Sequence, residues 1–208
     1  MQRINTNFLA VNYPRILLIL YAILTIWSAY NPRYFDVWVA EAITSFITVA
    51  IIIFLYIRGT KFSNLAYSCM AIFPVMHMIG AHYTFEFVPF DWFNNLISSE
   101  RNMYDRVAHF SVGLYSFAIL EYIFMKGITR SKFFAYSYSI FIIMSVAALY
   151  EIFEWQYATI SDPTAGIAIL GSQGDIWDAQ KDMLMDTLGG VTGAAVFYLK
   201  TLFKIKTS

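Results

Sequence analysis

The sequence predicts an all-α membrane protein, a bundle of about six transmembrane helices with both termini in the cytoplasm. Composition supports this fold class, because 59% of the 208 residues are hydrophobic and only 13% are charged, whereas soluble domains are about a quarter charged. Six long apolar runs and an uneven distribution of basic residues between the loops are the other two observations. The formal net charge of zero argues against a nucleic-acid partner, which leaves the lipid bilayer as the expected environment.

The apolar runs give the predicted spans in chain order, within a single polytopic domain covering residues 1–208. Each is close to the roughly 20 residues that a helix needs to cross about 30 Å of hydrocarbon. The first run lacks the small-residue cleavage pattern of a signal peptide, so we expect it to be retained as a helix. The third and fifth runs carry polar residues near one end. The predicted helices lie near residues 14–30, 37–57, 62–83, 105–125, 133–155 and 183–203.

Basic residues gather in the loops on one side of the predicted bundle. Arg58 and Lys61 lie between the second and third runs, and Lys126, Arg130 and Lys132 lie between the fourth and fifth. Loops rich in lysine and arginine remain in the cytoplasm. Both termini are therefore predicted to be cytoplasmic, and the regions 84–104 and 156–182 are predicted to face outward.

Four aspartates lead into the last apolar run at a helical spacing. Asp175, Asp178, Asp182 and Asp186 are separated by three, four and four residues, which places them on one face of a helix. The same face continues as glycines at positions 189, 190 and 193, which favour close packing between membrane helices. An alternative for the first three aspartates is stabilisation of the helix N-terminus, whose free N–H groups and dipole favour carboxylates.

Further polar residues fall at the same predicted depth. Asp105 and His109 are four residues apart at the outer start of the fourth run, Glu151 and Glu154 are three apart at the outer end of the fifth, and His82 lies near the outer end of the third. A charged group at the bilayer centre costs roughly 2.5–3.5 kcal/mol on insertion scales, so such residues normally face the bundle interior and mark a site. Ordinary headgroup flanks at the glutamates and an interhelical hydrogen bond at the histidine are the alternatives.

One histidine among several carboxylates is a ligand set suited to Zn²⁺, Mn²⁺ or Mg²⁺. Such a divalent cation would neutralise carboxylates that repel one another at low dielectric, and it would polarise a substrate oxygen or activate water. His109, Glu154 and Asp182 are the predicted catalytic residues, Asp105 and His82 are expected to support the ligands from behind, and without a metal His109 and Glu154 would form a proton-transfer pair. The predicted metal ligands are His109, Glu151, Glu154, Asp175, Asp178, Asp182 and Asp186.

Three segments, residues 104–110 (YDRVAHF), 151–155 (EIFEW) and 171–183 (GSQGDIWDAQKDM), resemble the YjdF-like bacterial inner-membrane proteins. That family is carried as a domain of unknown function. The resemblance covers most of the chain and implies a multi-pass protein of the bacterial inner membrane, without implying an activity.

A looser similarity connects the chain to VanZ-like proteins, which are linked to glycopeptide tolerance at the cell surface. It rests on an ordered pattern of acidic residues, His109 and glycines, given by Asp105/His109, Glu151/Glu154, Asp182/Asp186 and Gly189/Gly193. The chain departs from that pattern at Trp155-Gln156, where Glu-x-x-Gln is expected, and in a longer loop before the last helix. The similarity implies a cell-envelope role on the outer leaflet.

Three functional hypotheses follow from these residues. The first is a carboxylate/histidine site at the outer membrane boundary that binds a metal and acts on a lipid or envelope precursor. The second is a proton- or ion-coupled transporter with a relay of Asp186, Glu151 and Glu41. The third is a structural or regulatory protein whose polar cluster locks the bundle without catalysis.

Overall fold

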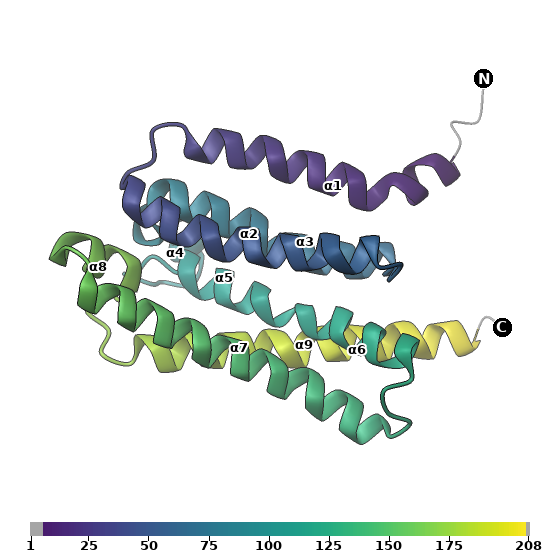
Figure 1. Ribbon diagram of the computed structural model, residues 1–208. Helices are drawn as coiled ribbons and strands as arrows, with labels where there is room; N and C mark the ends of the chain where they lie inside the picture. Colours follow the sequence, from purple (N-terminus) through teal and green to yellow (C-terminus); the bar gives the residue numbers. More distant parts are fainter. Residues whose placement is uncertain (1–5, 207–208) are drawn as a thin grey trace.

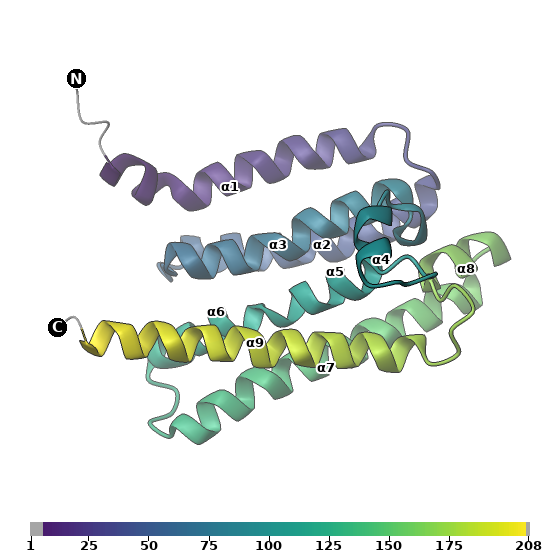
Figure 2. The same ribbon diagram turned by 180° about the vertical axis from the view of Figure 1, so that it is seen from behind.

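The long helices of this computed structural model, which describes residues 6–206, lie side by side as a bundle (Figure 1). Within these residues the chain forms nine α-helices and one 3₁₀ helix. α1 begins and α9 ends at the same end of the bundle (Figures 1 and 2). The elements are α1 (Thr6–Ala29), α2 (Phe35–Ile57), α3 (Asn64–Tyr83), η1 (Phe85–Phe87), α4 (Asp91–Leu96), α5 (Tyr104–Gly113), α6 (Tyr115–Lys126), α7 (Lys132–Ile160), α8 (Pro163–Leu170) and α9 (Asp178–Lys206).

Five segments of the described residues are long and apolar enough to cross a membrane: Val11–Ala29, Phe35–Ile57, Asn64–Tyr83, Tyr104–Lys126 and Lys132–Ile160. This confirms the predicted all-α membrane fold. α9, which contains the sixth predicted span, is not among them; Asp186, Lys200 and several glycines and threonines lie within its apolar stretch. It nevertheless runs the length of the bundle beside α5, α6 and α7 (Figure 2). The chain ends, 1–5 and 207–208, lie outside the described residues, and the cytoplasmic placement of both termini stays a prediction.

Burial separates central helices from lipid-facing ones. In the most apolar part of each span, 56% of the residues of α3 and 50% of those of the α5–α6 span are buried, against 11%, 28% and 22% for α1, α2 and α7. The outer helices expose large apolar side chains such as Ile26, Phe54 and Leu149. In water such a surface would be a liability, whereas in a bilayer it is the expected solvent-facing surface.

The fourth predicted span is broken at Leu114 into α5 and α6. At this point a Cβ on Gly113 would overlap the backbone of Asp186 and Gly190 in α9. Ser116 Oγ donates a hydrogen bond of 2.6 Å to the Gly190 carbonyl across the same contact. Small residues let membrane helices approach this closely, and the break lies where the two backbones meet.

Both loop regions predicted to face outward contain short helices at the end of the bundle opposite to where α9 ends (Figure 1). η1 and α4 lie within 84–104, and α8 lies within 156–182. α8 begins at an Asp162 cap, whose side chain accepts a hydrogen bond from the Thr164 amide at 2.9 Å, with Pro163 at the first helical position. The two neighbouring long helices also reach further than predicted, α7 to Ile160 and α9 back to Asp178.

Candidate functional site

The start of α5, the last part of α7 and the start of α9 meet at the end of the bundle that carries these short helices. α5 contributes Asp105 and His109, α7 contributes Glu151, and α9 contributes Asp182 and Asp186. His109 and the two α9 aspartates are buried, with Asp186 only 1% exposed. The sequence predicted only that these polar residues lie at a similar depth. In the structure they lie on three helices that meet.

His109 is held by Asp186 from one side of its ring. His109 Nδ1 lies 3.0 Å from Asp186 Oδ2. Since a carboxylate oxygen accepts, Nδ1 carries the hydrogen in this bond. In the neutral ring the Nε2 lone pair is then free to bind a ligand on the opposite side.

Three carboxylate oxygens face His109 Nε2. Asp105 Oδ1 lies at 3.7 Å, Asp182 Oδ1 at 3.9 Å and Glu151 Oε1 at 4.0 Å. These separations are too long for hydrogen bonds. Ligand atoms of Asp105, His109 and Asp182 all lie within 4.8 Å of one another. Glu151 is not a member of this group of three but lies beside it, against His109 Nε2, and within the described residues its buried Oε1 has no hydrogen-bond partner.

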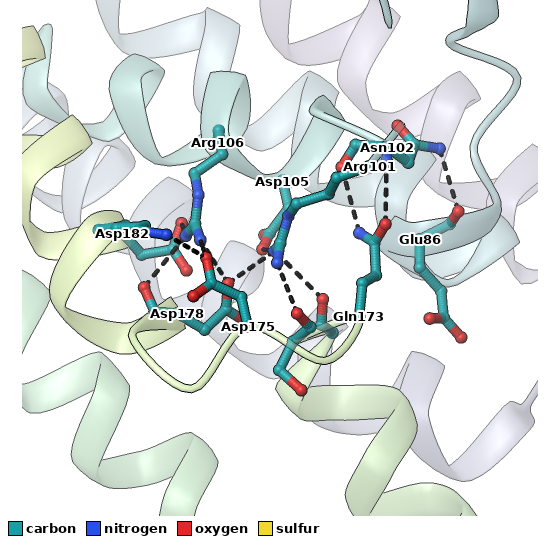
Figure 3. Close-up of polar contacts among 12 residues, drawn as sticks. Glu86, Arg101, Asn102, Asp105, Arg106, Gln173, Asp175, Asp178 and Asp182 are labelled. Carbon is teal, nitrogen blue, oxygen red and sulfur yellow. Dashed lines mark hydrogen bonds and ion pairs between the residues drawn. The ribbon is translucent and has the colours of Figure 1, made fainter. Parts of the chain in front are cut away.

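Arg106 carries the positive charge next to this volume (Figure 3). It is 4% exposed, its guanidinium forms an ion pair with Asp182, and it reaches Asp178 Oδ1 at 2.5 Å and Asp175 Oδ2 at 3.3 Å. Its Nη1 also donates to the Asp178 carbonyl at 3.1 Å. The sequence analysis did not single out Arg106 as a site residue. The available signal was its place in a predicted membrane helix directly after Asp105, where an arginine needs acidic partners.

A second arginine, Arg101, ties the loop before α9 to the start of α5 (Figure 3). It contacts Asp178 Oδ1 at 2.7 Å and Asp105 Oδ2 at 3.6 Å, and it donates to the Ser172 and Gly171 carbonyls. Gly171 has a φ of +54°, in the left-handed region that glycine adopts without strain. The loop conformation therefore supplies carbonyl acceptors for the guanidinium.

Asp175 lies at the edge of this network, before α9 begins. Lys181 Nζ donates to Asp175 Oδ2 at 2.6 Å, and the Trp177 amide donates to Oδ1 at 3.1 Å. The Lys181 hydrogen bond, followed by that amide, holds the pKa of Asp175 below its ordinary value. Asp175 and Asp178, both predicted as metal ligands, are thus brought to the cations and the helix start rather than to His109 Nε2.

A separate buried polar cluster joins α2, α3 and α7. Glu41 Oε2 accepts a hydrogen bond from the Tyr150 hydroxyl at 2.7 Å and lies 2.9 Å from His77 Nε2. His77 Nε2 also lies 3.0 Å from the Glu41 carbonyl oxygen, an acceptor, so Nε2 is the donor. Glu41 and His77 are 1% and 3% exposed. Tyr150 was missed by the sequence analysis, because nothing local marks which tyrosine meets a buried glutamate 109 positions away.

A cavity of about 170 Å³ connects the two clusters. Glu154, 8% exposed, lines this cavity and lies close enough to the carboxylates of Glu151 and Glu41 to interact with them electrostatically. His82, predicted to support the site, is elsewhere: its Nδ1 lies 3.0 Å from the Ser28 carbonyl, and its ring packs against Trp27. The polar residues that line the cavity are Thr44, Thr48, His77, Asp105, His109, Tyr115, Tyr150, Glu154 and Asp186.

Comparison with known proteins identifies relatives of the chain. A family described as "Predicted membrane protein (DUF2238)" matches residues 13–201. Inner membrane protein YjdF of Escherichia coli strain K12 is 28% identical over 157 residues, covering 74% of each chain. No solved structure matches. These matches do not support the looser VanZ-like similarity, whereas with the five apolar helices they confirm a multi-pass inner-membrane protein. The similarity to YjdF confirms the resemblance seen in the sequence, and the chain belongs to the predicted membrane protein family DUF2238.

Proposed function

We propose that the chain binds a divalent metal ion between α5, α7 and α9, and that the ion acts on a lipid or cell-envelope precursor. The ligands are His109 Nε2 and oxygens of Asp105, Glu151 and Asp182. One observation carries the proposal: three carboxylate oxygens lie within 4.0 Å of a histidine nitrogen whose ring is fixed from the other side by Asp186.

Charge makes a cation the natural occupant of this volume. Carboxylates 4 Å apart repel by several kcal/mol at the effective dielectric of a protein. Asp182 alone of the three facing carboxylates contacts Arg106, and the network as a whole is strongly acidic. Among the described residues it contains seven carboxylates (Asp105, Glu151, Glu154, Asp175, Asp178, Asp182, Asp186) and three fixed cations (Arg101, Arg106, Lys181).

In this proposal Asp105 and Asp186 have the opposite roles to those that the sequence analysis assigned to them. Asp105, expected behind the ligands, faces Nε2 beside Asp182, while Asp186, expected as a ligand, bonds to Nδ1. A carboxylate that accepts from the second nitrogen of a ligating histidine is the usual support of such a ligand. Oxygen ligands with one imidazole suit Mn²⁺, Zn²⁺ or Mg²⁺.

The chemistry follows from what surrounds the ion. A bound divalent ion polarises a phosphoryl or carbonyl oxygen, or generates a nucleophilic water. Glu154, which is buried, lies on the wall of the adjoining cavity, where a general base would reach a substrate bound in that cavity. Placement at the membrane boundary, beside a cavity with a mostly apolar wall, favours a lipid or lipid-linked precursor over a water-soluble substrate.

The competing function is a structural lock, and the Arg106 ion pairs favour it, since buried pairs fix helix positions without catalysis. Metal content separates the two. Protein purified in detergent without chelators is incubated with Zn²⁺, Mn²⁺ or Mg²⁺ and its metal measured by mass spectrometry, for wild type, His109→Ala, Asp182→Asn and the control Asp175→Asn. We expect about one ion per chain in wild type and control and loss in the other two. A folded wild type that binds none of the three ions refutes the metal site.

A further inference from the structure

We propose that the cavity beside the polar centre holds the hydrocarbon chain of a membrane lipid, which enters sideways from the bilayer between α2 and α7. The inference rests on the proposed function only in placing the lipid's head group at His109. The chain-binding cavity itself stands on separate observations.

The cavity has a polar end and an apolar body, like the lipid that it would take. Asp105, His109 and Glu154 line the polar end. The remaining wall comes from α2, α3, η1, α5, α6, α7 and α8 and is mostly apolar, with Phe73, Val112, Ile119, Ile142, Ile143 and Val146 among its members. A water-soluble substrate of the polar centre would leave this apolar wall without a partner.

The mouth of the cavity lies on the lipid-facing surface of the bundle. Ile142 and Val146, both cavity-lining, are 44% and 49% exposed, so the wall continues onto the outer face of α7. α2 packs mainly against α3 and α8, whereas α7 packs against α6, α8 and α9. The Tyr150–Glu41 hydrogen bond joins α2 to α7 near the polar end, and α7 diverges from α2 beyond it (Figure 1).

Size decides how much of a lipid fits inside. The cavity volume is about 170 Å³, close to the ~150 Å³ engineered apolar cavity that binds benzene. It therefore encloses a stretch of about six carbon atoms, by that comparison. The rest of the chain would pass between α2 and α7 into the bilayer. Filling the apolar wall removes the cost of an empty cavity.

Photocrosslinking tests this directly. The protein is placed in phosphatidylethanolamine–phosphatidylglycerol vesicles containing phosphatidylethanolamine with a diazirine on one acyl chain, and crosslinked residues are mapped by mass spectrometry. We expect crosslinks concentrated at Ile143 and Val146. Ala147→Phe, which adds bulk at a cavity-lining position that is 2% exposed, should reduce them at least fivefold. Leu149→Phe on the same helix, 66% exposed and outside the cavity wall, should leave them unchanged.

A second variant and the metal measurement keep the outcomes distinct. Val146→Trp narrows the mouth from an exposed position, so it should reduce the crosslinks at Ile143. This variant tests the cavity if Ala147→Phe does not fold. Crosslinks that persist in His109→Ala support the chain-binding cavity whether or not metal binds. Crosslinks spread evenly over lipid-facing helices, or undiminished by both cavity substitutions, overturn it, and a metal ion found in the same protein would leave the proposed function standing.

Discussion

Replacing one of two adjacent glycines in α9 should break the site, while replacing the other should not. A Cβ on Gly189 would overlap the carbonyl oxygen of Phe110 in α5, and backbone atoms cannot move away without separating the two helices. A Cβ on Gly190 would instead meet the Ile143 side chain at 3.7 Å, an ordinary van der Waals distance. The two substitutions therefore add the same methyl group in very different surroundings.

The expected magnitudes have opposite signs. Alanine in place of a helical glycine stabilises by about 0.4–1 kcal/mol where the backbone accepts it, so Gly190→Ala should be neutral or slightly stabilising. Gly189→Ala carries the same gain against an overpacking cost of typically 1–3 kcal/mol. We expect a net loss of about 1–2 kcal/mol from these two contributions. Asp186 lies one turn before Gly189. Moving α9 away from α5 should therefore also move the Asp186 carboxylate away from His109.

Thermal unfolding in detergent and metal titration of the same preparations measure both effects. Gly189→Ala should unfold at a lower temperature than wild type and bind metal at least tenfold more weakly, the scale on which loss of such a support acts. Gly190→Ala should match wild type in both assays. Equal stability and equal metal affinity in the two variants would refute the link between the glycine contact and the site.

Three further predictions follow from the ion pairs and from a pair of hydrogen bonds. Arg106→Gln leaves three aspartates without their buried cation and should lower the free energy of unfolding by about 3–5 kcal/mol in denaturant titrations; a change within 1 kcal/mol, by the same scale, contradicts it. The lowered pKa of Asp175 means that its ionised form stabilises the fold above the carboxyl's ordinary pKa, and that this contribution is lost as pH falls through the lowered value. An NMR titration of the Asp175 carboxyl should show that pKa rising towards its ordinary value in Lys181→Met. At the other end of the bundle, Glu121 accepts from the amide and hydroxyl of Ser63, so Glu121→Ala should cost about 1 kcal/mol in the same denaturant assay without changing metal content.

The membrane fold was predictable because apolar runs of about 20 residues are specified locally. The break at Leu114 was not, since it depends on how closely Gly113 approaches α9, a contact between residues more than 70 positions apart. The short helices α4 and α8 were not predicted either. Isolated helices of six and eight residues are too short to be stable alone, so their formation depends on the bundle beneath them.

For the candidate site, the depth of each side chain in the membrane was predictable from the sequence. The neighbouring helix towards which each side chain points was not. Hydropathy and loop charge placed His109 and His82 at a similar depth, but only helix rotation decides which neighbour a side chain meets. His82 turns towards α1, whereas His109 turns towards α9. The same limit applies to Arg106, whose ion pairs with α9 depend on partners that no local spacing identifies.

The register between α5 and α9 is what assigns each carboxylate its partner. The two helices run in the same direction from the polar end (Figures 1 and 2), and Arg106 meets Asp182, His109 meets Asp186 and Gly113 meets Gly189 at sequence separations of 76, 77 and 76. A slip of one helical turn, about 5.4 Å, would bring Asp182 to His109 and leave Asp186 against backbone with no cation near it. An unpaired buried carboxylate in that position is costly. The glycines therefore do more than permit close packing, because the contact that they allow selects which aspartate orients the histidine and which one faces the proposed ion.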